Sequence, residues 1–101
     1  MGVSFRRGAD IEAAPLQDEV ILFHAPQNKF CVLNRTSSFI WSQLSEPATC
    51  EEIAVRMGAS FSGVTLQEAL TDVDAALKEM LSLGLIVSVE TGNGSLAEVN
   101  R

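Results

Sequence analysis

The sequence contains few of the side chains on which most enzymatic and metal chemistry depends. It has one histidine, two cysteines and no tyrosine among 101 residues. A structural zinc site needs about four ligands at ordered spacing, and Cys31 and Cys50 do not form a C-x-x-C pair. The single histidine, His24, has no acid placed to orient it, so neither a Ser/His/Asp nor a Cys/His arrangement has support. We therefore expect no catalytic residue, no bound metal and no cofactor.

Basic residues and long apolar runs are also scarce. Seven lysines and arginines stand against thirteen acids, which gives a net charge of −6. Nucleic-acid binders need a basic face to displace counterions, so this balance argues against a nucleic-acid partner. The longest apolar runs, such as Val20 to Phe23 and Leu83 to Val87, are far shorter than the about 20 residues that span a bilayer. No apolar segment of a signal peptide follows Arg6 and Arg7, so we expect a cytoplasmic protein with no membrane partner.

The remaining composition indicates one folded domain. Apolar residues make up 47% of the chain, which is enough to build a single modest core. Residues 1–10 show no periodicity, so we expect a flexible N-terminal arm there. Residues 91–101 are rich in Gly, Asn and Ser, which predicts a flexible tail. The domain itself would occupy residues 11–90.

Short apolar segments in the first third of the chain favour β-strands. Ile11 to Ala14 is a weak candidate that a proline ends, whereas Glu19–His24 and Lys29–Leu33 are stronger. The Pro- and Asn-containing turn at Ala25–Asn28 makes the last two an antiparallel hairpin. Both strands are apolar at successive residues, so we expect both faces of their sheet to be covered. Near the other end of the domain, Leu85–Val89 is a candidate for a last strand or an extended arm.

Helix signals dominate the second half. A first helix is expected over about Thr36–Ser45, after polar residues suited to N-capping. The segments Thr49–Glu52 and Thr65–Glu68 both have the capping-box pattern that marks a helix start. The first box would open a short helix that closes at Gly58. The second opens the longest helix, about Leu66–Leu83, whose apolar arc is wider than a surface helix usually needs.

The junction between the hairpin and the first helix carries a family signature. Leu33-Asn34, Thr36, Ile40-Trp41 and Leu44 follow the pattern L-N-x-T-x-x-x-I-W-x-x-L. In this pattern the chain resembles PqqD-like proteins, the small peptide chaperones of pyrroloquinoline quinone (PQQ) biosynthesis and related peptide maturation pathways. The resemblance implies an α+β fold: a small winged-helix-like domain with an N-terminal three-stranded antiparallel sheet followed by three helices.

A binding surface is the functional feature that the residues themselves support. The strand Lys29–Leu33 should lie at a sheet edge, where unpaired N–H and C=O groups can accept an extended peptide as a further strand. Small residues along one margin of the longest helix could form the second wall of such a groove. On the residues alone, the favoured alternative is that the N-terminal arm or a second copy of the chain covers this edge.

The resemblance shifts that balance towards peptide binding. In PqqD-like proteins the leader of a precursor peptide lies as a strand beside the third strand and against the third helix. Carried over by position, the implied peptide-binding residues are Lys29, Phe30, Cys31, Val32 and Leu33 on the strand and Ala69, Asp72, Val73, Ala76 and Met80 on the helix.

The function implied by the resemblance is that of a non-catalytic chaperone. Such a protein binds the leader of a ribosomally synthesised precursor peptide and presents it to a modifying enzyme, with radical SAM maturases among the candidates. Two alternatives stay open at this point. One is a winged-helix nucleic-acid-binding or regulatory module, which the acidic composition disfavours. The other is a structural subunit that uses the edge strand to form a homodimer.

Overall fold

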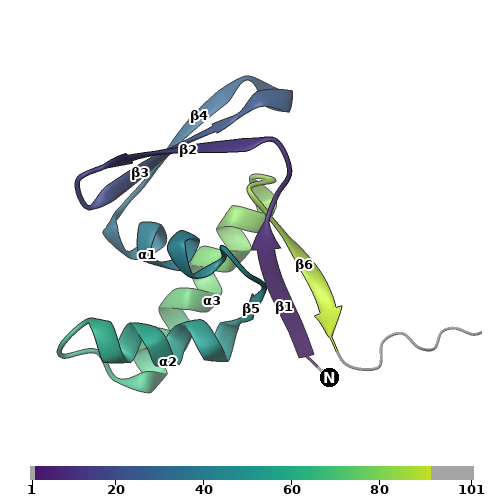
Figure 1. Cartoon of the computed structure of the whole chain (residues 1–101). Helices are drawn as coiled ribbons and strands as arrows, with labels where there is room; N and C mark the ends of the chain where they lie inside the picture. Colours follow the sequence, from purple (N-terminus) through teal and green to yellow (C-terminus); the bar gives the residue numbers. More distant parts are fainter. Residues whose placement is uncertain (1, 92–101) are drawn as a thin grey trace, which may run out of the picture.

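The computed structural model describes residues 2–91. Its elements are β1 (Gly2–Arg7), β2 (Ile11–Leu16), β3 (Glu19–His24), the 3-10 turn η1 (Ala25–Gln27), β4 (Lys29–Leu33), α1 (Arg35–Gln43), β5 (Ala48–Thr49), α2 (Cys50–Ser60), α3 (Leu66–Ser82) and β6 (Ile86–Thr91). The sheet β2-β3-β4 lies at one end of the helices, and β1 and β6 pair beside them (Figure 1). This arrangement confirms the predicted α+β fold, with a three-stranded antiparallel sheet, three helices and a C-terminal strand. Residues 92–101 of the predicted tail lie outside the described residues.

The three-stranded sheet forms largely where the sequence predicts it. β3 and β4 have the expected bounds and pair antiparallel, with Leu22 opposite Cys31. The turn between them works as expected, because Asn28 takes the left-handed conformation at φ 52. β2 is longer than predicted, since it continues through Pro15 to Leu16. Proline is tolerated there because β2 is an edge strand of its sheet.

Within residues 2–91 only one face of this sheet is covered, so the prediction of cover on both faces is wrong for the part of the chain that the structure describes. Leu22 and Leu33 face the helices and are buried. Phe30 and Val32 face away from the helices, and their exposed fractions are 73% and 60%. All three helices lie on the same side of the sheet, which leaves the other side open (Figure 1).

The helix starts follow the predicted local chemistry. Thr49 Oγ1 accepts a hydrogen bond from the Glu52 amide at 3.1 Å, and the Glu52 carboxylate accepts one from the Thr49 amide at 2.9 Å. Thr65 and Glu68 make the same reciprocal pair at the start of α3. At α1 the cap is Asn34, whose side chain accepts from the Ser37 amide at 2.8 Å. These bonds satisfy amide groups that a helix start otherwise leaves without partners.

The predicted end of α2 at Gly58 is wrong, because the helix continues to Ser60. Met57 lies one residue before the glycine and is 2% exposed, so its burial fixes this turn of the helix against the core. Packing of this kind overrides the weak helix propensity of a single glycine. At the end of α3 the expectation holds, since the helix ends at Ser82 and Gly84 takes φ 76.

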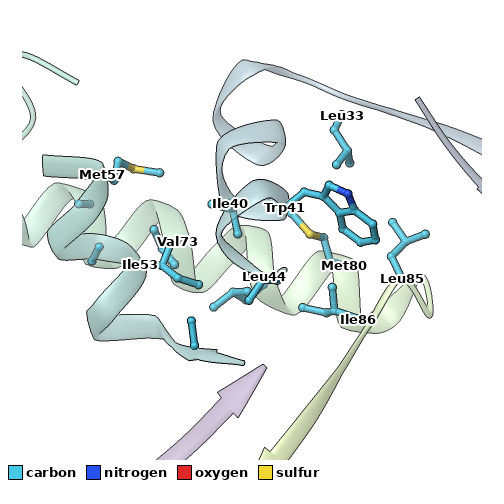
Figure 2. Packing of buried hydrophobic residues seen from close by; sticks show 14 of the residues in the cluster. Leu33, Ile40, Trp41, Leu44, Ile53, Met57, Val73, Met80, Leu85 and Ile86 are labelled. Carbon is cyan, nitrogen blue, oxygen red and sulfur yellow. The ribbon is translucent and has the colours of Figure 1, made fainter. Parts of the chain in front are cut away.

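The core lies between the covered face of the sheet and the three helices. Figure 2 shows Trp41 of α1 packed among Leu33 of β4, Met80 of α3 and Leu85. Trp41 is only 3% exposed, and its neighbours come from segments that are far apart in sequence. The indole therefore fixes the position of the end of β4 relative to the end of α3.

The predicted flexible arm contains a strand in the structure. β1 pairs antiparallel with β6 from Gly2 opposite Thr91 to Arg7 opposite Ile86, and it also pairs with the short β5. The Arg7 guanidinium donates from Nη2 and Nε to the Trp41 carbonyl oxygen, at 2.8 and 3.2 Å. It also lies over the Trp41 ring, with Cζ 4.7 Å from the centroid. Partners at the other end of the chain thus order a segment that has no periodicity of its own.

Candidate functional site

The outer edge of β4 is free of any strand in the described part of the chain. The sheet order is β2-β3-β4, so β4 pairs with β3 on one side only. The N-terminal strand, which was one predicted cover for this edge, pairs instead with β5 and β6 in a separate sheet. Along β4 the only charged side chain is Lys29. A free edge without proline or bulge is a ready template for another strand.

One end of this edge is already used within the fold. The Leu33 carbonyl oxygen accepts a hydrogen bond from the buried Ser38 hydroxyl at 3.1 Å. The next residue, Asn34, caps α1 with its side chain. An added strand would therefore pair with residues 29–32 and leave the sheet where α1 begins.

A groove runs between β4 and the last turns of α3. Two hollows of about 140 and 130 Å³ lie along it, and both include Cys31, Leu83 and Leu85 in their walls. Because they share these residues, the hollows lie end to end along β4, and we call them together the β4–α3 groove. Its remaining lining residues are His24, Gln27, Lys29, Phe30, Val32, Leu33, Asn34, Ser37, Ala76, Glu79 and Met80.

Alternation along β4 decides which of its side chains face this groove. Cys31 is opposite the buried Leu22, and Leu33 is opposite Val20, so both project towards the helices. Phe30 and Val32 project to the other face of the sheet. A guest strand paired with β4 would follow the same alternation, so every second guest side chain would enter the groove.

The groove has charged groups towards its two ends and an unreactive thiol between them. Burial raises the pKa of the Cys31 thiol, and the carboxylate of Glu79 raises it further. Cys31 is therefore protonated at neutral pH and is a poor nucleophile. Lys29 lines only one hollow and Glu79 only the other. The Nδ1 atom of His24 is buried without a hydrogen-bond partner among the described residues.

Two of the predicted α3 residues lie in this groove and three do not. Ala76 and Met80 line it, as expected for the wall opposite β4. Ala69 and Val73 are each 0% exposed in the core, where no guest can touch them. Asp72 is exposed beside a different hollow near the start of α3. The cause is the path of α3: its first half packs on α2, and only its last turns pass beside β4 (Figure 1).

Other groove residues escaped prediction although the sequence contains a signal for some of them. Leu83 lies seven positions after Ala76, two helical turns on, and is 45% exposed although it is apolar. Glu79 falls between them on the same side. Leu85 follows Gly84, whose positive φ turns the chain back towards the hairpin. Asn34 and Ser37 belong to the groove only because α1 starts directly at the end of β4.

The arrangement suits the binding of an extended chain. Each hollow is smaller than the about 300–1,000 Å³ of typical small-molecule sites, so each fits a single side chain. Among residues 2–91 there is no group of three or more His, Cys, Asp or Glu that could hold a metal ion. No helix within these residues combines the length and apolarity needed to cross a membrane.

Comparisons with known proteins agree with this geometry. The family model for coenzyme PQQ synthesis protein D (PqqD) matches residues 19–86, from the start of β3 to the start of β6. A solved structure described as "TbiB1 in Complex with the TbiA(beta) Leader Peptide" superposes with a TM-score of 0.74 and 26% sequence identity, covering 80% of this chain and 93% of that one.

A second solved structure, "Lasso peptide synthetase B1 complexed with the leader peptide", has a TM-score of 0.70. It covers 82% of this chain and 96% of that one, and its 19% identity shows a common fold alone. The comparison with curated proteins gave no match.

Proposed function

This chain belongs to the PqqD family, and on that premise we propose that it binds the leader of a ribosomally synthesised precursor peptide by strand addition to β4. The guest would become a fourth strand of the β2-β3-β4 sheet. Its main-chain groups would bond to residues 29–32, and alternate side chains would enter the β4–α3 groove. The protein would act as a peptide chaperone.

The single observation that carries this proposal is the free edge of β4 beside a groove with an apolar wall. Within residues 29–32, alternate residues turn their main-chain donors and acceptors to this edge, and no described segment pairs with that edge. Leu83 and Leu85 supply apolar surface where inward guest side chains would lie. The solved structure of TbiB1, which is 26% identical to this chain, is of a protein in complex with a leader peptide, and this supports the same use here.

The wider role follows from what the groove lacks. The described residues offer no activated nucleophile and no metal cluster, so the chain would hold its guest without altering it. We therefore propose a non-catalytic chaperone that works in the cytoplasm, where precursor peptides are made. It would present the core of the precursor to a separate modifying enzyme, with radical SAM maturases among the candidates.

Strand addition can be tested with synthetic leader peptides methylated on main-chain nitrogen. The neighbouring genes are searched first for a short precursor reading frame, and the leader of that precursor is titrated into the protein by calorimetry. In an added strand only every second guest residue bonds to β4. Methylation of one alternate set of amides should therefore abolish binding, and methylation of the other set should leave it nearly unchanged. Equal tolerance of both sets would contradict strand addition.

A pair of leucine variants tests the groove itself. Leu83→Gln places a polar group in the wall of the groove, whereas Leu66→Gln changes a similarly exposed leucine at the other end of α3. Peptide affinity should fall about tenfold for Leu83→Gln, because apolar surface that the guest buries is lost. Leu66→Gln should bind like the wild type. Equal affinities for the two variants would place the peptide elsewhere.

A further inference from the structure

The sheet has a second apolar surface, on the face turned away from the helices. Cross-strand partners share a face, and Phe23 is opposite Phe30 while Ile21 is opposite Val32. On β2, Ala14 is opposite Ile21 and extends the same surface. We call these five residues the outer face.

The outer face is exposed, and two of its aromatic rings pack against each other. Phe30 is 73% exposed and Val32 is 60% exposed, the two highest values among the large apolar residues whose side chains are described. The Phe23 and Phe30 rings pack with their centroids 4.8 Å apart. A hollow of about 310 Å³ lies beside them and is also lined by Ala14 and Ile21. An antiparallel sheet with one solvated face normally alternates apolar and polar residues, and β3 and β4 do not.

The charged side chains that border the outer face are acidic. Glu12 is opposite Phe23, and Glu19 lies two residues from Ile21 on the same strand, so both carboxylates border the outer face. The cation of these strands, Lys29, lies on the groove side of β4, opposite His24. The surface is thus an apolar centre with an acidic border.

We propose that the outer face is the docking site for the modifying enzyme, and that the enzyme meets it with an apolar patch bordered by lysine or arginine. This inference rests on the proposed function. β4 then serves both partners, because its edge pairs with the guest peptide while Phe30 and Val32 contact the enzyme. An enzyme docked there lies next to the strand from which the core of the precursor continues.

The size and charge of the surface argue for such a partner over a second copy of this chain. Three strands of about six residues cover about 300 Å², from a rise of about 3.3 Å per residue and a strand spacing of about 4.8 Å. Stable dimers bury about 800 Å² on each partner. Two copies would also bring the carboxylates of Glu12 and Glu19 against their equivalents, which like-charge repulsion disfavours. A small contact suits an enzyme that must release the chaperone after each round.

A matched pair of valine variants tests the docking site. Val32 on the outer face and Val55 on α2 are 60% and 59% exposed, so replacement by lysine removes a similar area of exposed apolar surface at each position. The probe is a purified candidate modifying enzyme chosen from the neighbouring genes, with binding measured by biolayer interferometry. Val32→Lys should weaken binding of the enzyme by about tenfold, and Val55→Lys should change it less than about twofold.

Phe30→Ser provides a second variant on the same face and should also weaken binding about tenfold. Circular dichroism checks that each variant is folded. The acidic border is tested by the double variant Glu12→Lys with Glu19→Lys, which should lower the association rate constant of the enzyme and make that rate less dependent on salt concentration. Glu46→Lys, in the loop after α1, should leave both unchanged.

Titration of the leader peptide separates this inference from the proposed function. The variant for this comparison is Ala14→Lys, on β2, because Ala14 belongs to the outer face and lines neither hollow of the groove. Ala14→Lys should weaken binding of the enzyme by about tenfold and bind the peptide with wild-type affinity, as Val55→Lys should. If the wild type binds no peptide, the proposed function fails. If peptide binding is intact and the enzyme binds Ala14→Lys as tightly as Val55→Lys, the docking site is wrong. Loss of a dimer in Val32→Lys, seen by mass measurement, would assign the face to a second copy and overturn the proposal.

Discussion

The contact between Arg7 of β1 and Trp41 of α1 should contribute measurably to the free energy of unfolding. The half-buried guanidinium donates two hydrogen bonds to one carbonyl oxygen and lies over the indole ring. A hydrogen bond from a charged group contributes about 1.5–3 kcal/mol, and a cation–π contact at a partly exposed site about 0.5–1 kcal/mol. Solvent screening and lost side-chain freedom offset part of this. We expect Arg7→Ala to lower the free energy of unfolding by about 2 kcal/mol.

The assay is urea unfolding followed by Trp41 fluorescence, with thermal unfolding as a second measure. For a domain of this size, about 2 kcal/mol corresponds to a fall in Tm of about 10 °C. Arg6→Ala is the matched control, because the neighbouring arginine is exposed. Arg7→Lys should fall between the two, since an ammonium keeps the charge but not the planar fork. If Arg6→Ala and Arg7→Ala lose the same stability, the contact of Arg7 with Trp41 does not hold β1 in place.

Two further predictions concern the thiols and the helix caps. Burial and Glu79 raise the pKa of Cys31, so its alkylation by iodoacetamide should begin at higher pH than that of a free thiol, and Glu79→Gln should shift the onset to lower pH. Bound leader peptide should slow the alkylation of Cys31 and leave the alkylation rate of Cys50 on α2 unchanged. Mass spectrometry of the alkylated protein measures both rates. Equal protection of the two thiols would exclude the groove as the peptide-binding site. Replacement of the capping threonine by alanine, Thr49→Ala or Thr65→Ala, should each lower the free energy of unfolding by about 1 kcal/mol in urea titrations. No change in either variant would contradict the capping account.

What the sequence could predict was set by contacts between near neighbours. The caps at Thr49 and Thr65 each depend on a residue three positions away, and the hairpin turn depends on Asn28 within itself. Such features need no knowledge of the rest of the fold. The bounds of β3 and β4 followed for the same reason.

What the sequence could not predict depends on distant partners. The hydrogen bond from Ser4 to the Val89 carbonyl oxygen joins residues 85 positions apart, and nothing in residues 1–10 signals it. The residues of the groove could not be predicted fully for the same reason. Periodicity placed Ala69 and Val73 on the apolar side of α3, but only the crossing of α3 past β4 decides that they lie in the core and that Leu83 lines the groove.

The pairing of β1 with β6 has a consequence for how this domain can be joined to other proteins. Gly2 lies opposite Thr91, so residues 2 and 91 are cross-strand neighbours. A domain with adjoining boundary residues can be inserted into a surface loop of a larger host, or circularly permuted with a short linker between them. Because the β1–β6 sheet is separate from the sheet that contains β4, either rearrangement leaves the β4–α3 groove unobstructed. Under the proposed function, the domain is therefore suited to insertion into the modifying enzyme itself.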